Sequence, residues 1–329
     1  MAEYDIRPYR AGDESAILAT FNHVFGQGDE AFAERTLEDW RYAYTDNPSG
    51  LRVWVAMKDG QCAAHYASQP YRTQVEGEER IFGQIIDSMV HPDHRRGLKR
   101  PGLFAEVARQ MLAACCGPDK DLVTFGLPID EAWRMGKTFL RYELVRRQVV
   151  VARETGAGAT DLPAGVEEVR SAPADARALF DDCARTWGAA VIRDTAYLDW
   201  RFVANPRHRY RLFRVADAAG ATRGLAVYRT GAWPTAGSGL ICDWLVPHAD
   251  EEAGALLRDA LLAAARAEGA PVLLGILPAW DPWFDRHQDW GFQVRSLHYL
   301  MSGRDNDPVH HMAWLRDNWW YTFAEVDLV

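Results

Sequence analysis

The sequence predicts a mixed α/β fold that occurs twice along the chain. First, an internal repeat is present, because the string Asp-Trp-Arg followed by an aromatic residue begins at Asp39 and again at Asp199. Second, each half alternates apolar runs of strand length with amphipathic runs of helical period. Third, the 329 residues leave about 150 for each copy, which is a common domain size.

Three further pairs of similar segments support the duplication. They follow in the same order: DSMVHP (87–92) with DWLVP (243–247), GLP (126–128) with GILP (275–278), and Tyr142 with Phe292 before a similar strand. We therefore predict an N-terminal domain at residues 1–153 and a C-terminal domain at 166–329. The linker between them, 154–165, is rich in small and turn-forming residues.

The first copy is expected to begin with one strand and two helices. The strand lies around Tyr4–Arg7, and the first helix covers Asp13–Phe25 with Asp13 as a candidate N-cap. The second helix carries Asp39-Trp40-Arg41 and ends at Asn47, because the proline that follows disfavours helix in the residue before it.

A β-rich region and a further helix follow. Strands are predicted at 51–57, 62–75 and 80–90 from their β-branched, aromatic and apolar content. Apolar residues from Leu103 to Leu112 recur with helical period, which predicts a helix after Pro101. The run at 122–127 has the length and content of a buried strand.

The segment between the strand ending at Val90 and the next helix is basic and contains glycine. Its cations are Arg95, Arg96, Lys99 and Arg100, and its glycines are Gly97 and Gly102. Glycines let backbone N–H groups approach an anion, and a helix N-terminus carries about half a positive charge. A solvated basic loop is the plain alternative. The strand–loop–helix setting favours a seat for a pyrophosphate.

This segment resembles the signature of the GNAT acyltransferase superfamily, a strand ending in Val-x-Pro before an Arg/Gln-x-x-Gly-x-Gly/Ala loop that opens a helix. Val90, Pro92, Arg95 or Arg96, and Gly97 fit it. The stretch from Leu98 to Pro101 departs from it, so the loop is longer or differently registered. The two copies resemble tandem GNAT proteins. This implies, for each copy, a mixed, mostly antiparallel central sheet flanked by helices.

The resemblance also implies a co-substrate, acetyl-CoA, and the residues that hold it. The cofactor-binding residues would be Ser88, Met89, Val90, Arg95, Arg96, Gly97, Leu98, Lys99, Gly102 and Leu103. Backbone groups around Ser88–Val90 would supply the donors for the oxyanion, because in the family this strand splays from its neighbour.

The best candidate for a general base is Asp87, three residues before the end of an otherwise apolar strand. A structural carboxylate is the alternative, and it is supported by the counterpart Asp243 in the second half. The family's usual acid, a Tyr before the last strand, has no equivalent at 133–141. The general acid therefore stays unassigned.

The second copy differs at the position of the basic loop. It carries Asp250, Glu251 and Glu252 in place of arginines. These carboxylates suit a helix N-terminus, but they would repel a pyrophosphate. We expect one CoA per chain, with the acceptor entering between the copies. The tryptophans of the C-terminal half either line an acceptor cleft or seal the copies together: Trp280, Trp283, Trp290, Trp314, Trp319 and Trp320.

Composition limits the other functions. A net charge of −9 disfavours a nucleic-acid partner, and neither a membrane span nor a signal peptide is apparent. Five scattered cysteines predict reduced thiols in a cytoplasmic protein, and no metal-ligand spacing is present.

The expected function is an acetyl-CoA-dependent N-acyltransferase in which a small amine attacks the thioester directly. A homodimer is possible. The alternatives are a Fem-type aminoacyl-tRNA-dependent transferase and a non-catalytic module that binds acyl-CoA or a metabolite.

Overall fold

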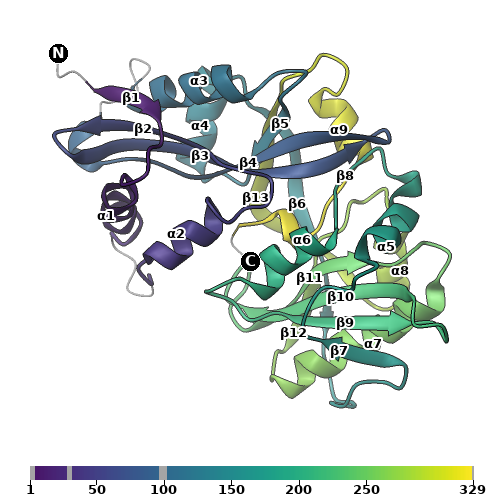
Figure 1. Ribbon diagram of the computed structural model, residues 1–329. Coiled ribbons are helices and arrows are strands. Elements are labelled where there is room, and N and C mark those ends of the chain that lie inside the picture. Colours follow the sequence, from purple (N-terminus) through teal and green to yellow (C-terminus); the bar gives the residue numbers. More distant parts are fainter. Residues whose placement is uncertain (1–3, 28–31, 96–101, 328–329) are drawn as a thin grey trace. The chain divides into compact units, whose positions relative to one another are not determined.

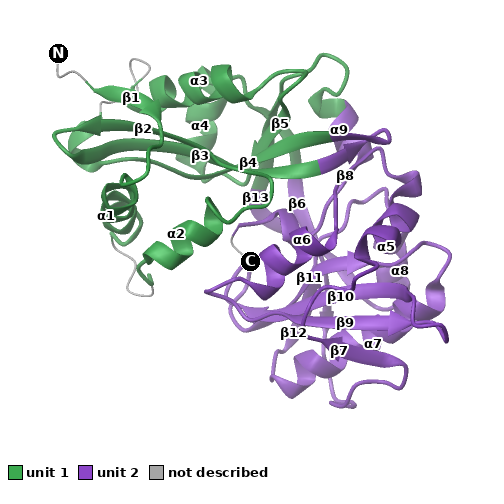
Figure 2. Cartoon of the chain, viewed as in Figure 1, with its two compact units in different colours: residues 1–72, 80–146, 300–313 green, residues 73–79, 147–299, 314–329 purple. Residues whose placement is uncertain are grey.

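The computed structural model describes residues 4–27, 32–95 and 102–327. They form two compact units, shown in green and purple in Figure 2. Unit 1 consists of residues 1–72, 80–146 and 300–313, and unit 2 of residues 73–79, 147–299 and 314–329.

Unit 1 is built on a mixed sheet with the strand order β1-β2-β3-β4-β5-β13. Its strands are β1 (Asp5–Pro8), β2 (Arg52–Lys58), β3 (Gln61–Val75), β4 (Glu78–Val90), β5 (Asp121–Gly126) and the second part of β13 (Gln293–Asp305). The pairs β1–β2, β2–β3 and β5–β13 are antiparallel, whereas β4 and β5 are parallel. The predicted strands of the first copy are all present, shifted by one or two residues.

Helices cover both faces of this sheet (Figure 1). The helices α1 (Glu14–Phe25) and α2 (Leu37–Ala43) lie on one face, and α3 (Leu103–Cys115) and α4 (Asp130–Phe139) on the other. A short 3-10 turn, Pro92–His94, follows β4.

Local sequence explains how the first two helices begin. Thr36 and Asp39 form a reciprocal capping box at the start of α2. Asp13 occupies the predicted N-cap position of α1, but its carboxylate makes no cap bond. It accepts hydrogen bonds from the Arg7 side chain and the Arg10 backbone N–H instead.

Unit 2 repeats the plan with the strand order β7-β9-β10-β11-β12-β6. Its strands are β7 (Val166–Val169), β9 (Arg211–Ala216), β10 (Thr222–Gly231), β11 (Ser238–Leu245), β12 (Val272–Gly275) and most of β6 (Glu143–Glu154). Neighbours are antiparallel except β11 and β12, which are parallel. The parallel pair β11–β12 corresponds to β4–β5 in unit 1.

The helices of unit 2 are mostly short. They are α5 (Ala176–Cys183), α6 (Thr195–Leu198), α7 (Glu251–Ala267), α8 (Pro282–Asp289) and α9 (Met312–Asn318), with 3-10 turns at Ala184–Thr186 and Phe323–Glu325 and a π turn at Asp199–Val203. A small ladder joins β14 (Trp319–Trp320) to β8 (Ala189–Val191) and β8 to residues 73–75 of β3. The apolar side of the long helix α7 packs on the sheet, and the helix and sheet together form the main core of the unit.

Each sheet receives one strand from the other half of the sequence. Residues 302–305 of β13 pair with β5 in unit 1, and residues 151–154 of β6 pair with β12 in unit 2. The bounds of the two compact units reflect this exchange of strands. They do not test where one sequence repeat ends and the next begins. The domains at 1–153 and 166–329 with their linker at 154–165 stay a prediction.

Candidate active site

The end of β4 and the beginning of α3 enclose a pocket of about 390 Å³ in unit 1. The parallel register of β4 with β5 ends at Gln84 and Phe125, before the last residues of β4. The pocket is lined by Ser88, Met89, Val90, His94, Arg95, Gly102, Leu103, Phe104, Ile129, Glu131, Ala132 and Met135. Most of its wall is apolar, with a few polar groups, as is usual for small-molecule sites.

Six of the predicted cofactor-binding residues lie together in this wall: Ser88, Met89, Val90, Arg95, Gly102 and Leu103. Four others, Arg96, Gly97, Leu98 and Lys99, lie outside the described residues. The sequence analysis missed the contribution of α4, which supplies Ala132 and Met135. The amphipathic pattern of this segment indicates a helix, but it does not show which pocket the helix borders.

The N-terminus of α3 is open to an anion. Its N-cap is Gly102, in an extended conformation, and among the described residues no side chain makes a cap hydrogen bond to the helix. The first N–H groups of a helix need an acceptor from outside, and the helix dipole favours a negative one. Arg95 is exposed beside it, and its Nε donates to the carbonyl oxygen of Val90 at 3.0 Å. This geometry fits a phosphate group.

The corresponding helix of unit 2 has an acidic N-terminus. Asp250 caps α7 by accepting a hydrogen bond from the Ala253 N–H at 3.1 Å. Arg223 in turn donates to Asp250 at 2.8 and 2.7 Å and to Glu252 at 2.8 Å. This helix terminus is therefore already satisfied by carboxylates and offers no comparable anion seat.

Asp87 lies next to the pocket and does not line it. Its backbone has a φ of 51°, in the left-handed region that Asp and Asn tolerate best after Gly. Its side chain is 7% exposed and pairs with Arg35. The hydroxyl of Tyr44 also donates to its Oδ2, at 2.7 Å. These contacts fit a positioned carboxylate, and its role as a base stays a prediction.

His65 is a second titratable group at this place, and the sequence analysis did not single it out. It is fully buried on β3, and its Nδ1 lies 2.9 Å from the backbone oxygen of Asp87. Since a carbonyl oxygen only accepts, Nδ1 carries the proton. Its Nε2 has no hydrogen-bond partner among the described residues. Burial lowers the pKa of His65, because it disfavours the charged imidazolium, so the imidazole is neutral near pH 7.

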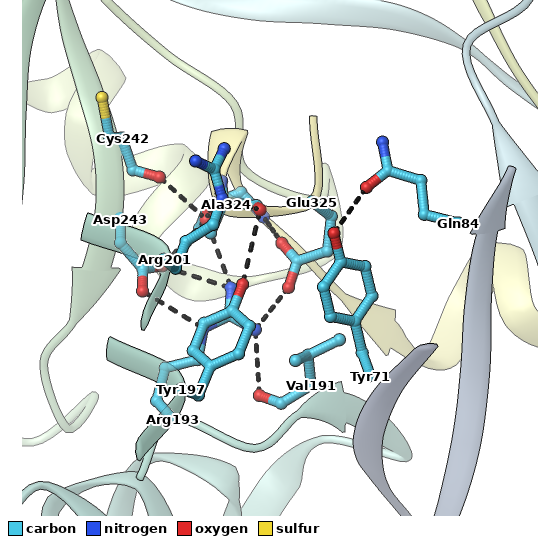
Figure 3. Close-up of polar contacts among 11 residues, drawn as sticks. Tyr71, Gln84, Val191, Arg193, Tyr197, Arg201, Cys242, Asp243, Ala324 and Glu325 are labelled. Atoms are coloured by element: carbon cyan, nitrogen blue, oxygen red, sulfur yellow. Dashed lines mark hydrogen bonds and ion pairs between the residues drawn. The ribbon is translucent and has the colours of Figure 1, made fainter. Parts of the chain in front are cut away.

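The ion pair of Asp87 has a counterpart in unit 2. Arg193, which like Arg35 directly precedes the capping residue of the Asp-Trp-Arg segment, donates from Nε to Asp243 at 3.1 Å. Arg193 also pairs with Glu325 (Figure 3). Thr322 donates to Asp243 at 2.8 Å. An Arg–Asp ion pair is therefore present at the corresponding place in both units.

The remaining aromatic candidates are mostly part of the core. Trp40 and Trp200 are 3% and 6% exposed, so both belong to the core. Trp283, Trp319 and Trp320 are fully buried, so these three do not line an open cleft. Tyr142 is buried, and its ring packs directly against Gly136 of α4. A side chain at position 136 would not fit, because its Cβ would lie only 2.8 Å from Cδ2 of Tyr142.

The described part of the chain offers neither a metal site nor a membrane-spanning helix. Within it, no group of three or more His, Cys, Asp or Glu side chains is arranged to hold a metal ion. None of its helices is both long and apolar enough to cross a bilayer. All five cysteines are free.

Residues 5–130 match the acetyltransferase (GNAT) domain family. This range contains the pocket residues from Ser88 to Ile129, whereas Glu131, Ala132 and Met135 lie just beyond it. The match to this family falls on the N-terminal part of the chain. A comparison with curated protein sequences finds no match.

Solved structures show that the whole chain has the fold of tandem GNAT proteins. A probable N-acyltransferase of unknown function from Enterococcus faecalis has a TM-score of 0.65 at 16% identity, over 93% of this chain and 73% of that one. A tandem GNAT protein from the clavulanic acid biosynthesis pathway has a TM-score of 0.55 at 16% identity, over 93% and 99%. N-myristoyltransferase from Saccharomyces cerevisiae with bound myristoyl-CoA has a TM-score of 0.58 at 11% identity, over 92% and 82%. The predicted mixed, mostly antiparallel fold is thus confirmed, and the predicted superfamily agrees with the family model that residues 5–130 match.

Proposed function

We propose that this chain transfers an acetyl group from acetyl-CoA to the nitrogen of a small amine. The observation that carries the proposal is the pocket between the end of β4 and the N-terminus of α3, which begins at Gly102. Such a place offers backbone donors to a pyrophosphate and an apolar wall to the acyl end of the same molecule.

Two parts of the pocket would hold the co-substrate. The α3 N-terminus and Arg95 would bind the pyrophosphate through backbone N–H groups and a guanidinium. The backbone of Ser88–Val90 would direct its polar groups to the thioester carbonyl, where negative charge develops during attack. CoA supplies the thiolate leaving group of the reaction.

Two side chains next to β4 are candidates to take the proton of the attacking ammonium. Asp87 carries negative charge but already accepts from Arg35 and Tyr44. His65 is neutral and its Nε2 is without a partner among the described residues. A neutral base with an available lone pair suits deprotonation of an amine near neutral pH. Replacing each in turn separates the two: loss of kcat in only one of Asp87→Asn and His65→Gln identifies the base.

The proposal is tested by acyl transfer with amine pools. The protein is incubated with acetyl-CoA, alone and with aminosugars, polyamines, amino acids or aminoglycosides, and free thiol is measured. Thiol release that depends on an amine supports the proposal. Binding of acetyl-CoA without turnover on any pool supports the non-catalytic module, and activity with aminoacyl-tRNA alone supports the Fem-type transferase.

The acyl chain is tested in the same assay. The neighbouring yeast enzyme was solved with myristoyl-CoA, and the pocket here is lined by Met89, Leu103, Phe104, Ile129 and Met135. Acyl-CoA donors of increasing length are compared at a fixed amine. We expect kcat/KM to be highest for acetyl-CoA, and a maximum at a long chain would contradict that part of the proposal.

A further inference from the structure

A second pocket lies within unit 2 and shares no residue with the proposed acetyl-CoA site. It has a volume of about 320 Å³ and is formed by the end of β6 and the start of β13 after α8. Its lining residues are Ala152, Arg153, Glu154, Gly291, Gln293 and Arg295. Four of these six side chains are charged or carry an amide. Such a wall favours a charged ligand, because an apolar one would displace water from these groups without replacing its hydrogen bonds.

The glycine of this wall places bare backbone next to Arg153. Gly291 follows α8 with a φ of 84°, in the left-handed region that glycine adopts without strain. Its N–H donates to the carbonyl oxygen of Gln288 at 2.8 Å, which closes the helix. A Cβ at position 291 would lie 4.0 Å from Nε of Arg153. The end of α8 therefore leaves room for a ligand in front of this guanidinium.

The polar side chains of the pocket are not engaged with one another. Within residues 4–27, 32–95 and 102–327, Arg153 and Arg295 form no side-chain hydrogen bond and no ion pair, and the same holds for Gln293. A guanidinium offers five N–H donors and a carboxamide two. Arg153 is half-buried and Arg295 is exposed. The donors of both arginines are therefore open to a ligand from solvent.

Arginines of α7 add positive charge beside the pocket. The pKa of Arg153 is lowered by burial and then by the charges of Arg258 and Arg266, whereas Asp259 opposes this effect. Asp259 itself accepts a hydrogen bond from Arg258 at 2.9 Å. Arg266 donates to the carbonyl oxygen of Thr155 at 2.9 Å, a neutral acceptor. The charges that act on Arg153 are thus mostly positive.

Glu154 is the acidic side chain in the wall, and it does not occupy the arginines. It follows Arg153 on β6, and neighbouring residues of a strand direct their side chains to opposite faces. In the described part of the chain it pairs with neither arginine of the pocket. Glu154 therefore lowers the net charge of the wall but leaves the guanidinium donors available.

We propose that Arg153 and Arg295, assisted by the carboxamide of Gln293, bind the oxyanion of a small molecule, a phosphate or a carboxylate group, in this pocket. A guanidinium suits such a group because its planar N–H donors match the oxygens of a carboxylate or phosphate. The site is not the counterpart of the proposed pyrophosphate seat. Arg266 belongs to the last turn of α7, whereas the seat corresponds to its first turn. The site does not depend on the proposed function.

An NMR titration of the full chain tests the site. The backbone amide signals of residues 291–295 are followed while inorganic phosphate or acetate replaces chloride at constant ionic strength. Binding should shift these signals in a saturable way and give a dissociation constant. The readout is local, so an anion bound at the N-terminus of α3 is read from other signals.

Four variants show which side chains hold the anion. Arg153→Met and Arg295→Met should each weaken binding about tenfold, because each removes a charge-assisted hydrogen bond. Glu154→Gln should strengthen binding, since it removes a negative charge from the same wall. The control is Arg177→Met, which changes an arginine on α5 that pairs with Asp181 and should bind as the wild type does.

Two results would overturn the proposal. One is the absence of a saturable shift at residues 291–295 of the wild type with either anion, a measurement that needs no variant to fold. The other is equal affinity in the wild type, Arg153→Met and Arg295→Met. Saturable binding of acetate alone would identify the group as a carboxylate, and binding of phosphate alone as a phosphate, and each supports the site.

Discussion

Asp87 and Asp243 show how one residue type is fixed in the same way in both halves. Each is held by an arginine from the segment before the Asp-Trp-Arg string. The correspondence of the two aspartates could be predicted from the repeated strings DSMV and DWLV. Their arginine partners could not, because Arg35 precedes Asp39 by four residues and Arg193 precedes Asp199 by six. A repeat search at fixed spacing therefore misses the pair.

Replacing Asp87 by Asn tests its catalytic role. Asn also tolerates the left-handed backbone at this position, so the change removes the charge without adding backbone strain. We expect kcat to fall at least tenfold while the affinity for CoA is kept. Steady-state kinetics and a CoA titration of the same preparation check this. An unchanged kcat with a loss of stability would make Asp87 a purely structural residue.

Replacing Asp243 by Asn gives the opposite pattern. The carboxylate is buried and holds the fully buried Arg193, and breaking such a pair leaves a charge without compensation. We expect the free energy of unfolding to fall by about 3–5 kcal/mol. Chemical denaturation measures this, with Asp259→Asn as the control because that carboxylate is half exposed. A loss no greater than that of the control would contradict the assignment.

The helices show which parts of an element the sequence can predict. The position of α3 was predicted from helical period, since periodicity depends only on the residues of the helix itself. The contribution of α4 to the pocket and the exchange of β6 and β13 were not predicted. Strand content shows that a segment pairs, but the choice of partner is set by the rest of the chain.

The helix α8 makes stability dependent on pH. His287 of α8 is fully buried, its Nδ1 lies 2.7 Å from the backbone oxygen of Trp283, and burial lowers its pKa to about 4. The unfolded state binds a proton below about pH 6.5, whereas the folded state does so only near pH 4. Stability is therefore full above pH 6.5 and falls as the pH is lowered, by up to about 3 kcal/mol at pH 4.

Denaturation at pH 7, 5.5 and 4 checks this, by comparing the wild type with His287→Gln. The variant cannot be protonated at this position, so its loss of stability on acidification should be smaller. His65 and His208 contribute in the same direction in both proteins and cancel in the comparison. Equal pH dependence in the two proteins would refute the role of His287.

The N-terminus of α3 should determine the affinity for CoA. Replacing Arg95 and Arg96 by Ala should weaken binding by about 1.5–3 kcal/mol for each charge-assisted hydrogen bond lost. The control is Arg109→Ala, an exposed arginine further along the same helix. Calorimetry on the three proteins measures the effect. Unchanged affinity in the double variant would place the pyrophosphate elsewhere.

At the scale of the whole molecule, the two copies keep one scaffold and differ in charge at one helix terminus. The parallel pairs β4–β5 and β11–β12 and the Arg–Asp pairs are common to both. The terminus of α3 begins at Gly102 and has no side-chain cap within the described part of the chain, whereas that of α7 is capped by Asp250 and flanked by Glu251 and Glu252. This inversion was visible in the sequence because it lies in consecutive residues. A cytoplasmic location and a homodimer stay predictions.

The central claim is that one copy binds acyl-CoA and the other does not. A calorimetric titration of the full chain with acetyl-CoA tests this most directly, because it gives the number of sites without requiring the amine. The account predicts one acetyl-CoA per chain, with weaker binding in the Arg95→Ala, Arg96→Ala double variant and unchanged binding in Arg109→Ala. Two molecules per chain, or no binding, would contradict it.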